Sequence, residues 1–196
     1  MSKRNTCVTL ILTAAWLGLS GAAVADIEGV LKACDDCHSG EGDVPAIAGL
    51  SEFYHSDQLY FYRDEERPCI DTPDASGETT TMCAATADLG DDQIDEIAAH
   101  YAAMPFVAAK QDFDATLAAA GNQIHDRGCV MCHTDGGGNA GDDAGILAGQ
   151  SMGYLKLTFD QYRAGEREQP GPMKGLLDAL SDDDVKALLH YYASQQ

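Results

Sequence analysis

The 196-residue sequence predicts an all-α protein made of two tandem units. The pentapeptide CDDCH at 34–38 returns as CVMCH at 129–133, and AIAGL at 46–50 returns as ILAGQ at 146–150. Each unit also ends with apolar residues spaced as on one face of a helix, and little of the chain alternates like a strand. We therefore expect mostly helices, with one small domain following each pentapeptide.

The first 25 residues have the layout of a secretory signal peptide. Lys3 and Arg4 precede an apolar stretch at 7–19, and the small residues 23–25 match an A-x-A cleavage site. We expect cleavage before Asp26 and export to the periplasm, with an uncleaved N-terminal tether as the alternative. Because no segment reaches the roughly 18 to 20 apolar residues of a spanning helix, we expect no membrane insertion.

The composition is strongly acidic. Two of the 12 basic residues precede the cleavage point, so ten basic residues face 32 acidic ones in the remainder. Such a surface repels nucleic acid and anionic lipid and favours a basic protein partner. Solubility in a saline habitat explains the same composition equally well.

The repeat also places the remaining helices and the domain boundaries. YRDEER at 62–67 and YRAGER at 162–167 lie 100 residues apart, and we expect a helix near each, at 56–66 and 151–164. A closing helix follows in each unit, because apolar residues recur at i, i+3, i+4 and i+7. These residues are Ile94, Ile97, Ala98 and Tyr101 in the first unit and Val185, Leu188, Leu189 and Tyr192 in the second. We assign 26–104 to the first domain, 105–114 to a linker and 115–196 to the second domain.

The CxxCH pentapeptide is the attachment sequence of c-type haem. Its two thiols add across the haem vinyl groups, and the histidine that follows ligates the iron. Zinc also binds CxxC pairs, and a redox dithiol is a further alternative, but neither requires the histidine twice. We therefore predict two covalently bound haems, each serving as the core of a small domain. Their attachment residues are Cys34, Cys37, Cys129 and Cys132, and their proximal ligands are His38 and His133.

Two methionines are the candidates for the sixth iron ligand. Met82 and Met173 hold corresponding positions, each seven residues before a leucine that leads into the closing helix, and we expect both in loops. Core packing is the alternative for either one alone. Histidine and methionine together leave no open coordination site, which predicts electron transfer rather than catalysis. A haem enzyme such as a peroxidase would require one methionine to leave its iron.

Two further cysteines flank an insertion in the first unit. Nine extra residues lie between Arg67 and Met82 relative to the second unit, and Cys69 and Cys83 stand at its boundaries. In an oxidising compartment we expect a disulfide between them. It either fixes the Met82 segment or simply closes an enlarged loop.

With these motifs the chain resembles tandem diheme class I cytochromes c. KQDFDATLAAAGNQIHDRGCVMCHTDGG, ILAGQSMGYL and the terminal YYASQQ resemble the diheme subunit of flavocytochrome c sulfide dehydrogenase. The resemblance implies two cytochrome c domains whose haem propionates face each other, with His38 and Met82 on one iron and His133 and Met173 on the other. It also implies a flavoprotein (FAD) partner that oxidises sulfide and a soluble or membrane acceptor. A free diheme carrier that serves a terminal oxidase or reductase is the alternative.

One position departs from that family. A proline after the motif offers its carbonyl to the second nitrogen of the proximal histidine. Pro45 fits this role, but the second unit has Gly145, next to a glycine-rich insertion that we expect to be flexible. Because a rigid surface loses less on binding, we expect the first domain to make the larger contact with the flavoprotein. Neutral drift in loop length is the alternative.

Overall fold

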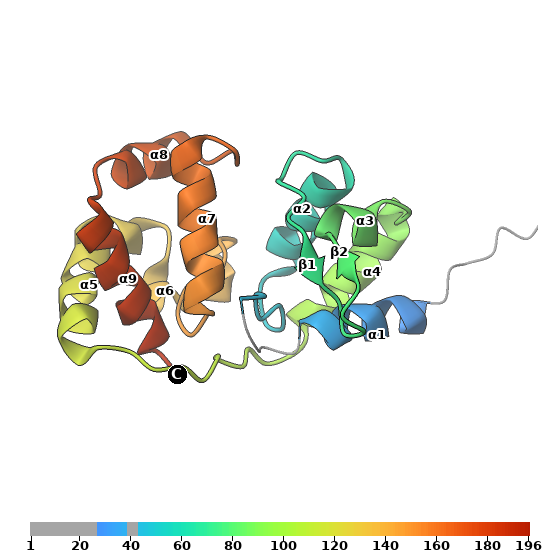
Figure 1. Cartoon of the computed structure of the whole chain (residues 1–196), viewed down its shortest axis with the longest axis horizontal. Coiled ribbons are helices and arrows are strands. Elements are labelled where there is room, and N and C mark those ends of the chain that lie inside the picture. The colour runs from blue at the N-terminus through green and yellow to red at the C-terminus, as the bar shows by residue number, and fades with distance from the viewer. Residues whose placement is uncertain (1–26, 39–42) are drawn as a thin grey trace, which may run out of the picture.

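The structure is a computed structural model that describes residues 27–38 and 43–196. The signal peptide expected at 1–25 and its cleavage before Asp26 lie outside the described residues. Figure 1 shows two groups of helices joined by an extended segment. We call elements α1 to α4 the first half and elements α5 to α9 the second half.

The first half contains α1 (Ile27–Cys37), α2 (Glu52–Arg63), α3 (Met82–Thr86) and α4 (Asp91–Ala102). A short antiparallel ribbon, β1 (Thr72–Pro73) and β2 (Thr79–Thr80), pairs Thr72 with Thr80. Its turn is held by the Asp74 carboxylate, which accepts hydrogen bonds from the backbone N–H groups of Ser76 and Glu78. The ribbon occupies the insertion and lies outside the predicted all-α pattern.

The second half contains α5 (Ala115–Arg127), α7 (Met152–Ala164), α8 (Gly171–Asp178) and α9 (Asp182–Ala193). Three short elements lie between α5 and α7: the 3₁₀ turns η1 (Cys129–Met131) and η2 (Ala140–Asp142), and α6 (Thr134–Gly137). Ser181 caps α9 by accepting from the N–H of Asp184, because the first helical N–H groups have no partner within the helix.

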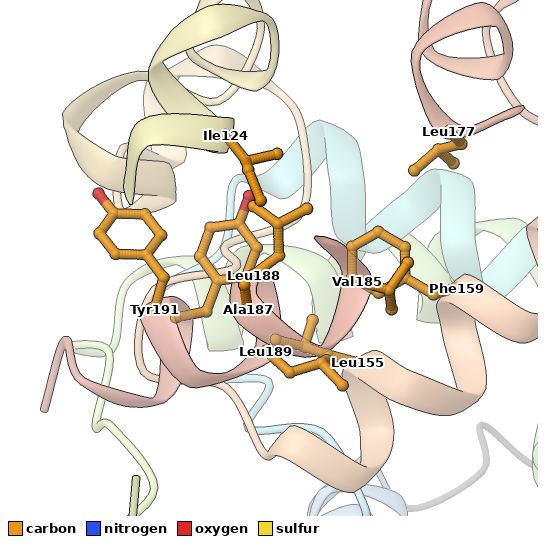
Figure 2. Close-up of a cluster of buried hydrophobic side chains, with 10 residues drawn as sticks. Ile124, Leu155, Phe159, Leu177, Val185, Ala187, Leu188, Leu189 and Tyr191 are labelled. Carbon is orange, nitrogen blue, oxygen red and sulfur yellow. The ribbon is translucent and has the colours of Figure 1, made fainter. Parts of the chain in front are cut away.

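The core of the second half lies between α5, α7 and α9 (Figure 2). The α5 and α9 backbones cross at Gly121, where an added Cβ would lie 2.2 Å from the carbonyl oxygen of Ala187. Leu188 and Tyr192 of α9 are fully buried, as are Ile94 and Ala98 of α4. The two amphipathic closing helices are therefore confirmed.

The predicted helices near 56–66 and 151–164 correspond to α2 and α7. The expectation of loops around the two methionines is wrong, because Met82 is the first residue of α3 and Met173 lies within α8. Thr81 caps α3 by accepting from the N–H of Ala84. Proline in the first turn of α8 is tolerated because no intrahelical hydrogen bond is lost there.

The linker at 105–114 is held against the second half by hydrogen bonds. The N–H of Ala109 donates to the Gly149 carbonyl at 2.8 Å. The side chain of Gln111 donates to the Gln150 carbonyl and accepts from the N–H of Met152, at 2.8 and 2.9 Å. Among the described residues, no helix combines the length and apolar character needed to cross a membrane.

Candidate haem sites

Both CxxCH motifs form one turn of helix. The N–H of His38 donates to the carbonyl of Cys34, and that of His133 donates to Cys129, at 2.8 and 2.9 Å. The four motif cysteines take no part in the disulfide, and all are at least partly exposed. Within 27–38 and 43–196, no three or more His, Cys, Asp or Glu side chains group together as metal ligands.

A backbone carbonyl acts on each proximal histidine. His38 Nδ1 lies 2.9 Å from the Pro45 oxygen, and the Gly145 backbone raises the pKa of His133, against the effect of burial. Burial lowers the pKa of both histidines, although the carbonyl contacts oppose the shift. A neutral imidazole that donates through Nδ1 presents Nε2 as its metal ligand. Gly145 therefore holds the position in the second half that Pro45 holds in the first.

The candidate methionines lie in short helices that lead toward the closing helices. Met82 is partly buried at the start of α3, and Met173 packs against the buried core of the second half. Their role as iron ligands stays a prediction.

The expected disulfide between Cys69 and Cys83 is present. Both sulfurs lie within 3.9 Å of the Arg67 carbonyl oxygen. The bond therefore joins α3, which begins at Met82, to the segment that carries Arg67.

Helix α2 faces α7 (Figure 1), and a set of corresponding side chains from the two halves meets at Gln58 of α2. Arg67 and Arg167 hold equivalent positions, and a guanidinium nitrogen of each donates to the same oxygen, Gln58 Oε1, at 2.7 Å. Arg67 also stacks on Tyr62, and Arg167 on Tyr162, with 4.2 and 4.6 Å between the guanidinium carbon and the ring centre. The recurring segments YRDEER at 62–67 and YRAGER at 162–167 were the sequence signal for this cluster. We used them only to align the two units and predicted no site there.

These two arginines are buried cations without a carboxylate. They are 6% and 5% exposed, and neither forms an ion pair with a described acidic residue. Arg67 Nε and Arg167 Nη1 are buried without a hydrogen-bond partner. Burying unpaired charge is unfavourable, so this site requires an anion. Haem carries two propionate carboxylates, and with the CxxCH cysteines and histidines the residues fit that group.

The same arginines lower the pKa of a neighbouring tyrosine, Tyr154. Burial raises the pKa of Tyr154, but the positive charges of Arg67 and Arg167 outweigh it and lower that pKa to about 8.

A second buried contact ties the halves together. Gln150 Nε2 donates to the Ala46 carbonyl at 2.6 Å, and Gln150 Oε1 accepts from the Ala46 N–H at 3.0 Å.

Two histidines outside the motifs are also buried. His125 Nδ1 lies 3.1 Å from the Tyr192 hydroxyl. Burial lowers the pKa of His55 to about 4, although a hydrogen bond to the backbone of Ile47 opposes the shift. Burial also lowers the pKa of His125. Both histidines therefore pack as structural residues outside the motifs.

Comparison with known proteins identifies the family. A cytochrome c family model matches residues 118–196. Cytochrome c4 from Stutzerimonas stutzeri is 31% identical to this chain over 94% of the chain and 95% of its own length. The chain belongs to the cytochrome c4 family. This cytochrome c4 family member carries two covalently attached haems and is an electron carrier rather than an enzyme.

Further relatives extend this result. The thiosulfate dehydrogenase electron acceptor of Stutzerimonas stutzeri strain A1501 is 31% identical, covering 83% of this chain and 78% of its own length. The structure of reduced recombinant cytochrome c4 from Pseudomonas stutzeri matches with a TM-score of 0.69 and 26% identity, over 87% of this chain and 97% of that one. Thiosulfate dehydrogenase from Marichromatium purpuratum matches with a TM-score of 0.68 and 28% identity, over 83% of this chain but 36% of that one. The predicted all-α fold with two cytochrome c halves is confirmed.

Proposed function

We propose that this cytochrome accepts electrons from a thiosulfate dehydrogenase and passes them to a soluble or membrane-bound acceptor. The observation that carries the proposal is the 31% identity to a thiosulfate dehydrogenase electron acceptor across 83% of the chain. Coupling two thiosulfate ions to one tetrathionate ion releases two electrons. Two haems hold one electron each, so a single carrier takes up both electrons of one turnover.

Mixing the oxidised protein with a thiosulfate dehydrogenase and thiosulfate tests this proposal. The absorption bands of reduced haem should appear only when both enzyme and thiosulfate are present. Ascorbate serves as the control, because it reduces a competent cytochrome without the enzyme. Reduction by ascorbate but not by the enzyme and thiosulfate would exclude this donor.

We also propose that His38 and Met82 ligate one iron and that His133 and Met173 ligate the other. The contact between His38 and the Pro45 carbonyl and the matched positions of both methionines support this assignment. Replacing Met173 with histidine should lower the reduction potential of one haem and remove one of two methionine-to-iron absorption bands. Met131→Leu is the matched control, because Met131 is 81% exposed and should leave both bands unchanged. Two surviving bands in the Met173 variant would contradict the assignment.

We further propose export to the periplasm and domain boundaries at 26–104, 105–114 and 115–196. The Cys69–Cys83 disulfide supports an oxidising compartment, and the helices of each half fall within the proposed ranges. The mass of the mature protein tests the cleavage point. An N-terminus other than Asp26 would move the first boundary.

A sulfide-oxidising flavoprotein is the second candidate donor. The segments 110–137, 146–155 and 191–196 support it, because they resemble the cytochrome subunit of flavocytochrome c sulfide dehydrogenase. The expected preference for docking on the first half loses part of its basis, since the glycine-rich loop of the second half is also held by hydrogen bonds. In that loop Asp142 accepts from Thr134, and Asn139 donates to both.

A pull-down under native conditions, followed by flavin analysis, separates the remaining alternatives. A retained FAD protein that reduces the haems with sulfide would favour the second candidate. Slower amide exchange confined to 115–196 on binding would refute docking through the first half. Reduction by neither donor would instead favour a free carrier that serves a terminal oxidase or reductase.

A further inference from the structure

The arginine cluster between α2 and α7 contains one uncharged side chain that contacts both halves. Arg67 Nη1 and Arg167 Nη2 each lie 2.7 Å from the same atom, Gln58 Oε1. The two nitrogens can therefore be no further apart than twice that distance. Two positive charges this close repel each other, and the repulsion is strong where water is excluded. The arrangement therefore needs a group that holds the two guanidiniums together.

The amide of Gln58 has only one orientation that fits this contact. A guanidinium has donors and no acceptor, so the atom that meets both arginines must be the amide oxygen. The amide nitrogen donates instead to Asp57 Oδ2 at 3.2 Å. Turning the amide over would place its N–H groups against two cations. Gln58 therefore presents only an acceptor to the arginines.

The second half has a different residue at the position of this glutamine. The repeat aligns α2 with α7 at an offset of 100 residues, and Thr158 stands where Gln58 stands in the first half. Arg67 and Arg167 are otherwise matched, since each also stacks on a tyrosine of its own half. One glutamine of the first half therefore binds an arginine from each half.

The charge of this acceptor matters as much as its position. Glutamine is neutral, so it holds the two guanidiniums without cancelling either charge. Arg67 Nε and Arg167 Nη1 remain buried without a hydrogen-bond partner. A carboxylate in place of the amide would neutralise one positive charge and repel a bound anion. The neutral amide leaves both charges available to the carboxylates of haem.

We propose that Gln58 is a positioning residue that joins Arg67 and Arg167, one from each half, into a single doubly charged site for haem carboxylates. Because the site is shared, a change at Gln58 acts on both haems, although the residue belongs to the first half. This inference does not depend on which protein donates the electrons. A failure of thiosulfate dehydrogenase to reduce the protein would leave it unchanged.

The first substitution changes the charge of Gln58 in the intact protein with both haems. Gln58→Glu keeps an acceptor of the same length but adds a negative charge beside both arginines. Negative charge favours ferric iron, so the reduction potentials of both haems should fall. Gln123→Glu is the matched control, because it makes the same change at an exposed position of α5. Solvent and salt screen that charge, so its effect on the potentials should be clearly smaller.

The second substitution removes the hydrogen bonds without changing the charge. Gln58→Met keeps the approximate length of the side chain but has no amide oxygen. The N–H protons of both guanidiniums should then exchange with water roughly tenfold faster, because each loses one charge-assisted hydrogen bond. NMR of the reduced protein measures this exchange. In Gln58→Glu the same protons should exchange as slowly as in wild type, because both hydrogen bonds remain.

The outcomes test the shared site from two sides. Lower potentials at both haems in Gln58→Glu, with faster exchange at both arginines in Gln58→Met, would support it. Unchanged potentials, a shift confined to one haem, or faster exchange at only one arginine would overturn it. An equally large shift in Gln123→Glu would also overturn it, since net charge alone would then explain the effect. If one of the two Gln58 variants does not fold, the other still tests the role of Gln58.

Discussion

Replacing Gly121 with alanine should destabilise the protein by about 2 kcal/mol. The added Cβ would lie 2.2 Å from the Ala187 carbonyl oxygen and 2.7 Å from Tyr191 Cβ, whereas atoms in contact are about 3.5 Å apart. Helices α5 and α9 would therefore have to separate by roughly 1 Å at their closest point. Both obstructing groups lie on α9, whose residues Leu188 and Tyr192 are fully buried, so the helix cannot shift without opening the core.

The expected loss of stability in Gly121→Ala is the difference between two opposing free-energy effects. Overpacking a core costs about 1–3 kcal/mol, and a backbone obstacle belongs at the upper end of that range. Alanine in place of glycine stabilises a helix by up to about 1 kcal/mol. For a chain of this length, a net loss of about 2 kcal/mol lowers Tm by roughly 4 to 8 °C.

Gly175→Ala is the matched control. Gly175 lies within α8, and a Cβ there would meet no atom within 4 Å. The control should retain or slightly raise Tm through helix propensity alone. Thermal unfolding of both oxidised variants, followed by circular dichroism, makes the comparison. A Gly121→Ala protein as stable as Gly175→Ala would refute the close crossing of α5 and α9.

Three further predictions concern the disulfide, a buried histidine and the contact between the halves. Replacing Cys69 and Cys83 together with serine should cost about 3 kcal/mol in guanidinium chloride unfolding, because the disulfide closes a 15-residue loop; an unchanged midpoint would contradict this. The pKa of His55 falls from 6.5 to about 4 on folding, so the unfolded chain binds the extra proton between these values and stability should drop as pH falls through this window. The slope is at most about 1.4 kcal/mol per pH unit, and His55→Gln should flatten it; equal slopes would show that His55 is not responsible. Gln150→Leu should leave the buried N–H and carbonyl of Ala46 unpaired, and each unpaired group should cost about 1–3 kcal/mol of stability. Amide exchange at Ala46 should become faster. Unchanged exchange would show that the contact does not hold the halves together.

Features encoded by short stretches of sequence could be predicted. The CxxCH motifs and the apolar faces of α4 and α9 each depend on residues within about two helical turns. The disulfide between Cys69 and Cys83 followed from counting cysteines, once the haem motifs had taken the other four.

Features that depend on tertiary contacts could not be predicted. Gln58 and Arg167 are 109 residues apart, and nothing in either local sequence indicates that they meet. Met173 lies in a helix and not in the expected loop, because proline is well tolerated in the first turn of a helix.

The paired hydrogen bonds between Gln150 and Ala46, together with the held linker, bear on how fast charge can cross the molecule. Domains joined by a loose tether rearrange on microsecond to millisecond timescales. Here the side-chain amide of Gln150, 1% exposed, hydrogen-bonds both the N–H and the carbonyl of a single residue of the opposite half, Ala46. Electron transfer from one half to the other therefore does not require a hinge motion between them.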